Sequence, residues 1–234
     1  MNMPLVEKLQ NHPQVVGLIE YGSAHYRDDF AVGDYDLFVV YDGLDTAVES
    51  LHFYIDGVPV DLNLCSLSYL RTQDVLSGFE TNLLDGRIIY DKDGVVAALL
   101  EQMQKTSFVH YSDHDVAFTR HGHRHVLDKV RGRLESEPLL CKLLLSTNIY
   151  WLIQSYFGIR RLHYQGEKQA LAYLAEHEPE IHNLISQFYL SELHEQVEIT
   201  KQLIDLILAP IGGAWSDGEA LAFGEDVGDL QMKG

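Results

Sequence analysis

The first part of the chain, up to about residue 95, carries short apolar runs in which hydrophobic and polar positions alternate. Such alternation, bounded by Gly, Pro and Asp, is typical of half-buried β-strands. Strands are predicted over 15–22, 35–41, 58–66 and 86–94, the last with its closing turn. Helices are predicted over 3–12, 46–55 and 66–79, with a short helix or turn over 23–30. Asp56-Gly57 predicts a hairpin-type turn.

Beyond about residue 95 the pattern changes to long segments with helical periodicity, and Gly is scarce until the end of the sequence. Helices are predicted over 95–105, 113–135, 139–157, 167–177 and 179–208, the last with Pro179 near its first turn. Residues 211–234 are Gly-rich and acidic, which predicts a loosely attached tail. The chain therefore reads as α+β: a unit of strands and helices over 1–94, then a helical bundle over 95–210. The boundary is expected between 93 and 107.

Charge and composition narrow the class of protein. The 234 residues include 46% apolar residues and carry a formal net charge of −18, which argues against a nucleic-acid-binding surface. This charge is compatible with a cationic substrate, with a bound divalent metal, or simply with solubility. Cys65 and Cys141 fit no CxxC spacing, so we expect buried thiols in a reducing cytoplasm. We expect no signal peptide at the N-terminus, and polar residues interrupt 139–157, which indicates a buried helix and no membrane span.

Two carboxylates stand at the start of an apolar strand in "GDYDLFVV". Because side chains alternate along a strand, Asp34 and Asp36 share a face, which Phe38 and Val40 continue into the core. Two carboxylates this close repel each other unless a cation lies between them. Their hard oxygen atoms suit Mg²⁺ or Mn²⁺.

The strand "VPVDLNLCS" adds a third carboxylate, Asp61, on its otherwise polar face. If this strand pairs beside the strand of Asp36, the three acids can surround one or two metal ions, as in two-metal phosphoryl transfer. Gly22-Ser23 can approach a phosphate closely with backbone N–H groups and a hydroxyl. The alternative is a cluster of carboxylates at solvated strand ends that binds nothing.

Gly22-Ser23, ten residues, Asp34-x-Asp36 and then Asp61 on an apolar strand together resemble the DNA polymerase β-like nucleotidyltransferase superfamily. The chain is most similar to its aminoglycoside and minimal nucleotidyltransferase branch. The resemblance covers about residues 14–92 and implies a small mixed sheet flanked by helices. It departs in Ala24-His25, where many members carry Arg after Gly-Ser, and substrate handling is expected to differ from that of the relatives at this point.

The resemblance implies roles for these residues. Asp34 and Asp36 would bind Mg²⁺ or Mn²⁺ bridging the triphosphate of a nucleoside triphosphate such as ATP, and Gly22 and Ser23 would hold its β- and γ-phosphates. Asp61 would be a third metal ligand or the base that accepts the proton of the acceptor hydroxyl. The reaction would transfer a nucleoside monophosphate and release pyrophosphate.

Basic and histidine residues elsewhere offer weaker candidates. Arg120 and Arg124 belong to a basic stretch that could face triphosphate, but a solvated face with acidic partners is the simpler interpretation and the one we favour. His121 and His125, four residues apart, match part of a transition-metal site without an evident third ligand. Arg120 and His125 also fit the R-x4-H pattern of HEPN ribonucleases. His123 lies on the apolar stripe and is expected to pack against another helix.

The helical part supplies the remaining candidates. Lys142 and Lys168 could reach a triphosphate, although both also read as ordinary surface lysines. The aromatic residues at helical spacing, Tyr150, Trp151, Tyr156 and Phe157, are expected in the core rather than on a base-stacking surface.

Two classes of function follow. The first is a nucleotidyltransferase acting on a hydroxyl of a small molecule, for which the acidic surface favours a cationic acceptor such as an aminoglycoside, or on a protein. The second is a regulatory, antitoxin-like protein that keeps the fold and binds nucleotide or a protein partner. Association with a protein partner or with a second copy of the chain stays open.

Overall fold

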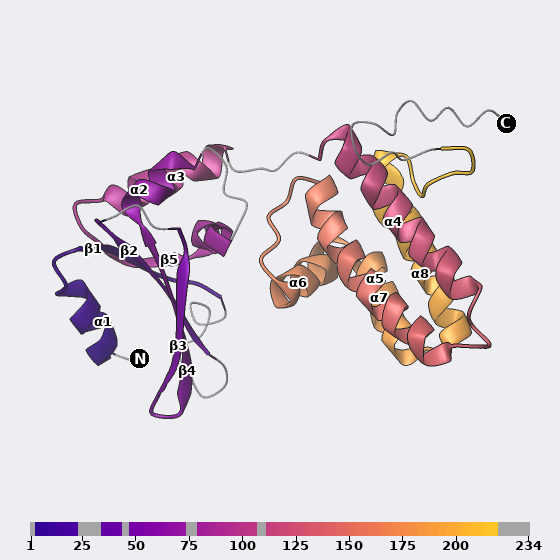
Figure 1. The fold of residues 1–234 in the computed structure, drawn as a ribbon, viewed down its shortest axis with the longest axis horizontal. Coiled ribbons are helices and arrows are strands. Elements are labelled where there is room, and N and C mark those ends of the chain that lie inside the picture. The colour runs from indigo at the N-terminus through magenta and orange to yellow at the C-terminus, as the bar shows by residue number, and fades with distance from the viewer. Residues whose placement is uncertain (1–2, 23–33, 44–46, 74–78, 107–110, 220–234) are drawn as a thin grey trace. The chain divides into compact units, whose positions relative to one another are not determined.

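The computed structural model describes residues 3–22, 34–43, 47–73, 79–106 and 111–219 (Figure 1). The chain forms two compact units, Met1–Val109 and His110–Gly234. The class is α+β, with a five-stranded mixed sheet in the first unit and helices in the second. No helix within these residues is long and apolar enough to cross a membrane.

The sheet of the first unit has the strand order β3-β4-β2-β1-β5. Its strands are β1 (Val15–Glu20), β2 (Tyr35–Tyr41), β3 (Glu49–Ile55), β4 (Val58–Ser66) and β5 (Arg87–Asp91). The helices are α1 (Met3–Gln10), α2 (Leu67–Thr72) and α3 (Val95–Thr106), and a 3₁₀ helix covers Phe79–Asp85. Strands β2 and β4 pair in parallel, whereas the other neighbours pair antiparallel.

The sheet buries both of its faces. Leu37 and Val39 of β2 and Val60 of β4 pack with α1 on one face. Phe38 and Val40 pack on the other face with α2 and α3, and Figure 1 shows α1 on the opposite side of the sheet from α2 and α3. The alternation read from the sequence thus assigns the faces of β2 and β4 correctly, because period two fixes which side chains enter each core.

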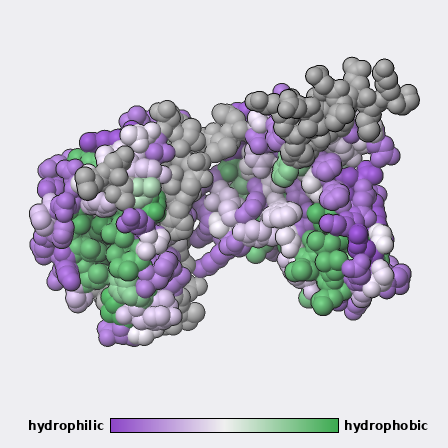
Figure 2. All heavy atoms as spheres, viewed as in Figure 1, coloured by the Kyte–Doolittle hydropathy of each residue, from purple (hydrophilic) through white to green (hydrophobic). Residues whose placement is uncertain are grey.

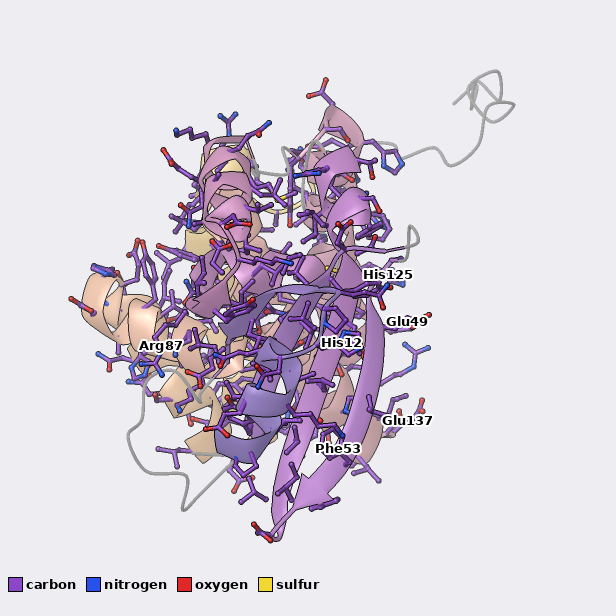
Figure 3. The ribbon with its side chains drawn as sticks, turned by 90° about the vertical axis from the view of Figure 1, so that its left-hand side faces the viewer. His12, Glu49, Phe53, Arg87, His125 and Glu137 are labelled. Carbon is purple, nitrogen blue, oxygen red and sulfur yellow. The ribbon has the colours of Figure 1, made fainter. Side chains whose placement is uncertain are left out.

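Strand β3 corrects the helix predicted over 46–55. Asp56 and Gly57 both have positive φ, 51° and 81°, as a two-residue hairpin turn requires, and this turn pairs β3 with β4. The strand lies at the edge of the sheet, where Glu49 and Phe53 mark it in Figure 3. The hairpin pairing therefore overrides the apparent helical pattern.

Helix α3, which the sequence placed at the start of the helical bundle, belongs to the first compact unit, Met1–Val109. Val96, Leu100 and Met103 are buried in the same apolar cluster as Phe38 of the sheet. Asp91 caps the helix, since its carboxylate accepts hydrogen bonds from the backbone N–H groups of Val96 and Ala97.

The second unit is a bundle with one continuous apolar core. Its helices are α4 (Asp113–Arg131), α5 (Pro138–Ile159), α6 (Glu167–His177), α7 (Pro179–Leu190) and α8 (Leu193–Leu208), followed by a 3₁₀ turn over Ala209–Ile211. The single helix predicted over 179–208 is wrong. Ser191 and Glu192 are extended, with ψ of 158° and 160°, and divide it into α7 and α8.

Residues 212–219 correct the expectation of a loose tail as far as the structure describes it. Arg120 of α4 donates hydrogen bonds to the carbonyl oxygens of Gly213 and Ala214 and pairs with Glu219. Arg124 donates to the carbonyl oxygen of Trp215. The segment therefore runs along α4 and is held by its arginines.

The histidine and aromatic residues of the bundle divide between core and surface. His123 is buried as expected and hydrogen-bonds Asn148 and Ser155 of α5. Tyr156 and Phe157 are also buried, but Tyr150 and Trp151 are 38% and 48% exposed, so the core prediction is wrong for these two. On the face shown in Figure 2, hydrophobic patches interrupt the hydrophilic surface of both units.

Candidate functional site

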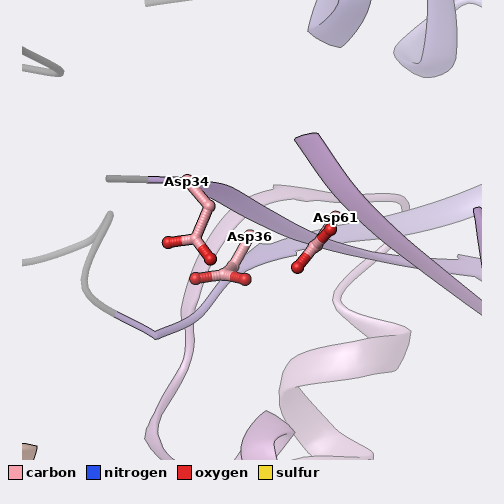
Figure 4. A group of neighbouring side chains, drawn as sticks. All are labelled: Asp34, Asp36 and Asp61. Atoms are coloured by element: carbon pink, nitrogen blue, oxygen red, sulfur yellow. The ribbon is translucent and has the colours of Figure 1, made fainter. Parts of the chain in front are cut away.

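Three carboxylates meet at one end of the parallel strand pair. Asp36 of β2 is the register partner of Asp61 of β4, and Asp34 directly precedes β2. Neighbouring strands lie about 4.8 Å apart, so this register places the two strand carboxylates side by side. Oxygen atoms of all three residues lie within 4.8 Å of one another (Figure 4). In the part of the chain that the structure describes, this is the one group of three or more potential metal ligands.

This arrangement changes the pKa of the Asp36 carboxyl group. Burial, reinforced by the negative charges of Asp34 and Asp61, raises the pKa of Asp36 to about 7. A desolvated carboxylate between two like charges favours a proton or a cation. The cluster is therefore built so that a bound cation relieves repulsion present in the protein alone.

Gly22 touches this cluster from the end of β1. Its φ is +64°, and a Cβ atom added to it would lie 2.2 Å from Oδ2 of Asp36. The preceding Tyr21 donates its backbone N–H to the carbonyl oxygen of Asp36, over 3.3 Å. Glycine is thus required both by the backbone conformation and by the space beside the carboxylate. Ser23, the other half of the predicted phosphate-binding pair, lies outside the described residues.

A buried network of polar side chains lies beside the carboxylate cluster. Asn63 of β4, 1% exposed, donates a hydrogen bond to the Tyr21 hydroxyl. Asn63 in turn accepts a hydrogen bond from the hydroxyl of Ser50 on β3. Burial and the charges of Asp36 and Asp61 raise the pKa of Tyr21, so its hydroxyl stays neutral. The network fixes β1, β3 and β4 around the carboxylates.

His52 is a site residue that the sequence patterns missed. It is the register partner of Asp61 across β3 and β4, and its Nδ1 lies 2.6 Å from Oδ1 of Asp61. The His52 side chain is 65% exposed. The alternation of Ser50, His52 and Tyr54, followed by Asp-Gly, was the signal that would have placed it on a strand beside Asp61.

The other candidates lie in the second unit. Lys142 on α5 and Lys168 on α6 are exposed, and their contact with a triphosphate stays a prediction. His121 and His125 stack with their ring centroids 5.7 Å apart, and His121 also packs edge-on against Trp215.

The basic stretch of α4 has acidic partners, as its simpler interpretation expects. Arg120 pairs with Glu219, and Arg124 with Asp128 and Asp217. Arg133, just after the end of α4, lies 3.4 Å from Glu137. These contacts give the arginines a structural role in holding the bundle and its C-terminal segment.

The chain has a distant structural similarity to a protein of known structure. The crystal structure of a nucleotidyltransferase-like protein from Exiguobacterium sibiricum is similar, with 15% sequence identity and a TM-score of 0.46 over 88% of this chain and 73% of that chain. No family model matches the chain, and no curated protein matches it. We therefore base the functional proposal on the geometry of the carboxylate cluster.

Proposed function

We propose that the first unit is a metal-dependent nucleotidyltransferase that moves a nucleoside monophosphate from a nucleoside triphosphate to an acceptor hydroxyl. The observation that carries this proposal is the convergence of Asp34, Asp36 and Asp61 within 4.8 Å, with Gly22 against Asp36. The three carboxylates supply hard oxygen ligands for a metal ion. Gly22, beside them, lets a phosphate come close to the backbone.

The residues fit a divalent cation such as Mg²⁺ or Mn²⁺. They offer carboxylate oxygens only, and these are graded from the exposed Asp34 to the half-buried Asp36 and Asp61. Mg²⁺ typically binds through one or two carboxylates together with substrate phosphates. Burial and the two acidic neighbours raise the pKa of Asp36, so a cation beside its carboxylate would be favourable, which supports this proposal.

When bound, the metal would neutralise charge on the phosphate oxygens during in-line displacement. Asp34 and Asp36 would hold it, and Gly22 would leave room for the triphosphate beside Asp36. The acceptor oxygen forms a bond to the α-phosphorus, while the bond from that phosphorus to the bridging oxygen breaks and pyrophosphate leaves with the electron pair.

Asp61 has two roles compatible with its position, a third metal ligand or the base that accepts the acceptor proton. Nδ1 of His52 lies 2.6 Å from Oδ1 of Asp61. His52 would orient the Asp61 carboxylate for either role. The formal net charge of −18 favours a cationic acceptor, such as an aminoglycoside, over a nucleic acid.

The experiment is a label-transfer assay with the full chain. It uses α-labelled ATP, GTP, CTP and UTP with Mg²⁺, and either aminoglycosides or a cell lysate as the source of acceptor. The inactive control is the double variant Asp34→Ala/Asp36→Ala. The matched control is Asp42→Asn, which removes an exposed charge just beyond the opposite end of β2.

We expect label on an acceptor with wild type and Asp42→Asn, and none with the double variant. Label on a protein would identify protein nucleotidylation. No transfer, together with no metal-dependent nucleotide binding, would refute the enzyme and leave the regulatory function.

A further inference from the structure

A separate hollow lies between α4 and α5 in the second unit. Its volume is about 320 Å³, at the lower end of the range usual for small-molecule sites. Phe118, Gly122 and His123 line it from α4, and Trp151 and Ser155 line it from α5. A space of this size suits one fused ring system rather than an extended chain.

Aromatic side chains form the walls of this hollow. Phe118 and Trp151 are 53% and 48% exposed, although most large apolar side chains of the bundle are buried. Tyr111 also lines it and packs against α5 so closely that a Cβ at Gly158 would lie 2.6 Å from its ring. Exposed aromatic rings around a concavity are typical of sites that bind flat apolar ligands.

Gly122 keeps the hollow open. It lies in the middle of α4, where glycine destabilises a helix relative to alanine. An added Cβ would meet no atom within 4 Å, so no tight packing of the described residues explains the glycine. The missing side chain leaves the space between Phe118 and Trp151 unfilled.

The polar groups of the hollow are fixed and uncharged. His123 is 4% exposed and is held by Asn148 over 2.7 Å and by Ser155 over 3.1 Å. Burial lowers the pKa of His123, which keeps its ring neutral near pH 7. Thr119 and Gln154 add a hydroxyl and an amide. Within the described ranges, no Asp, Glu, Lys or Arg lines this space, so a charged ligand would lose its hydration without gaining a partner.

We propose that this hollow is a binding site for a neutral, flat heteroaromatic molecule, with its ring between Phe118 and Trp151 and its polar edge towards Ser155. The site is independent of the carboxylate cluster and of the proposed transfer reaction. Its aromatic walls supply dispersion and stacking, and its few hydrogen-bonding groups supply orientation.

The test is binding of indole to the full chain. Binding is monitored by saturation-transfer NMR and by the side-chain N–H signals of the two tryptophans. Indole-3-acetate has the same ring with a negative charge, and cyclohexanol is neutral without an aromatic ring. Gly122→Leu fills the hollow and retains the fold, because its Cβ has open space and the helix gains propensity. Gly132→Leu makes the same change at the exposed end of α4, where a Cβ meets only ordinary contacts.

We expect indole to bind and to shift the N–H signal of Trp151 and not that of Trp215. Gly122→Leu should weaken binding at least about tenfold, whereas Gly132→Leu should bind as wild type does. Indole-3-acetate and cyclohexanol should each bind at least about tenfold more weakly than indole. Absence of indole binding at millimolar concentration would overturn the proposal. So would binding unchanged by Gly122→Leu, or equal binding of indole-3-acetate.

Discussion

Replacing Asp36 with asparagine should stabilise the metal-free protein while removing its response to metal. Asp36 is half-buried between Asp34 and Asp61, and its ionised form suffers from lost hydration and from repulsion by both neighbours. Asparagine has nearly the same shape and no charge. The variant therefore removes this lost hydration and repulsion together with a proposed metal ligand.

The magnitude follows from the pKa of Asp36, which rises from 3.8 to about 7 in the folded protein. This difference corresponds to at most about 4 kcal/mol. Because the carboxylate is partly exposed and screened by solvent, we expect about 1–2 kcal/mol of stabilisation in Asp36→Asn. For a domain of this size, the unfolding temperature should rise by roughly 5–10 °C.

The raised pKa of Asp36 also sets the direction in which folding stability changes with pH. A carboxyl whose pKa is higher in the folded state holds its proton more tightly there, so folding stability falls as pH rises from about 4 to about 7. The advantage of Asp36→Asn should accordingly be full at pH 8 and vanish near pH 4. Added Mg²⁺ should raise the unfolding temperature of wild type at pH 8 and leave that of the variant unchanged.

The assay is scanning calorimetry with EDTA or with Mg²⁺ at both pH values. Tryptophan fluorescence provides an internal control, since both tryptophans, Trp151 and Trp215, lie in the second unit. A lower unfolding temperature for Asp36→Asn at pH 8 in EDTA would refute the reasoning. An equal gain at pH 4 would refute it as well.

Three further substitutions test other contacts. Gly22→Ala should weaken Mn²⁺ binding at least about tenfold, because its Cβ would lie 2.2 Å from Oδ2 of Asp36. Gly57→Ala is the control, because Gly57 also has a positive φ, 81°, but lies in open space; equal weakening by both variants would contradict this cause. His52→Ala should lower the rate of label transfer about tenfold and change Mn²⁺ affinity less, because His52 orients one carboxylate oxygen of Asp61. His52→Gln should recover part of the rate, and an unchanged rate in His52→Ala would argue against this role. Arg120→Gln should speed hydrogen exchange in 213–219, because Arg120 holds three groups of that segment, and unaltered exchange would show that other contacts hold it.

Much of the site could be predicted because it depends on local rules. Alternation along 35–41 and 58–66 fixes which side chains share a face, and Asp36 and Asp61 are the charged residues on those faces. What the sequence left conditional was the parallel pairing of the two strands. The structure supplies it, with Asp36 and Asp61 in register.

His52 was missed because its segment was assigned to the wrong type of element. The residues over 46–55 contain enough apolar side chains to suit a helix, and only pairing with β4 selects the strand. Once β3 is a strand, its register with β4 places His52 beside Asp61. Long-range pairing of this kind is not encoded in the local pattern.

The contacts of residues 212–219 were also beyond local reasoning. A Gly-rich acidic composition predicts little ordered structure, yet Arg120 and Arg124, almost a hundred residues earlier in the chain, bind this segment through its carbonyl oxygens and acidic side chains. The exposure of Trp151 has a similar cause. Gly122 on the neighbouring helix leaves the space that a larger residue would close.

The central claim is that Asp34, Asp36 and Asp61 form a divalent metal site that a nucleotide completes. Its most direct test is a Mn²⁺ titration followed by electron paramagnetic resonance, with and without a non-hydrolysable nucleoside triphosphate analogue. We predict that wild type and Asp42→Asn bind Mn²⁺, that the analogue tightens this binding, and that Asp34→Asn and Asp61→Asn each weaken it at least about tenfold. Mn²⁺ binding that is absent, or that is the same in all four proteins, would contradict the claim.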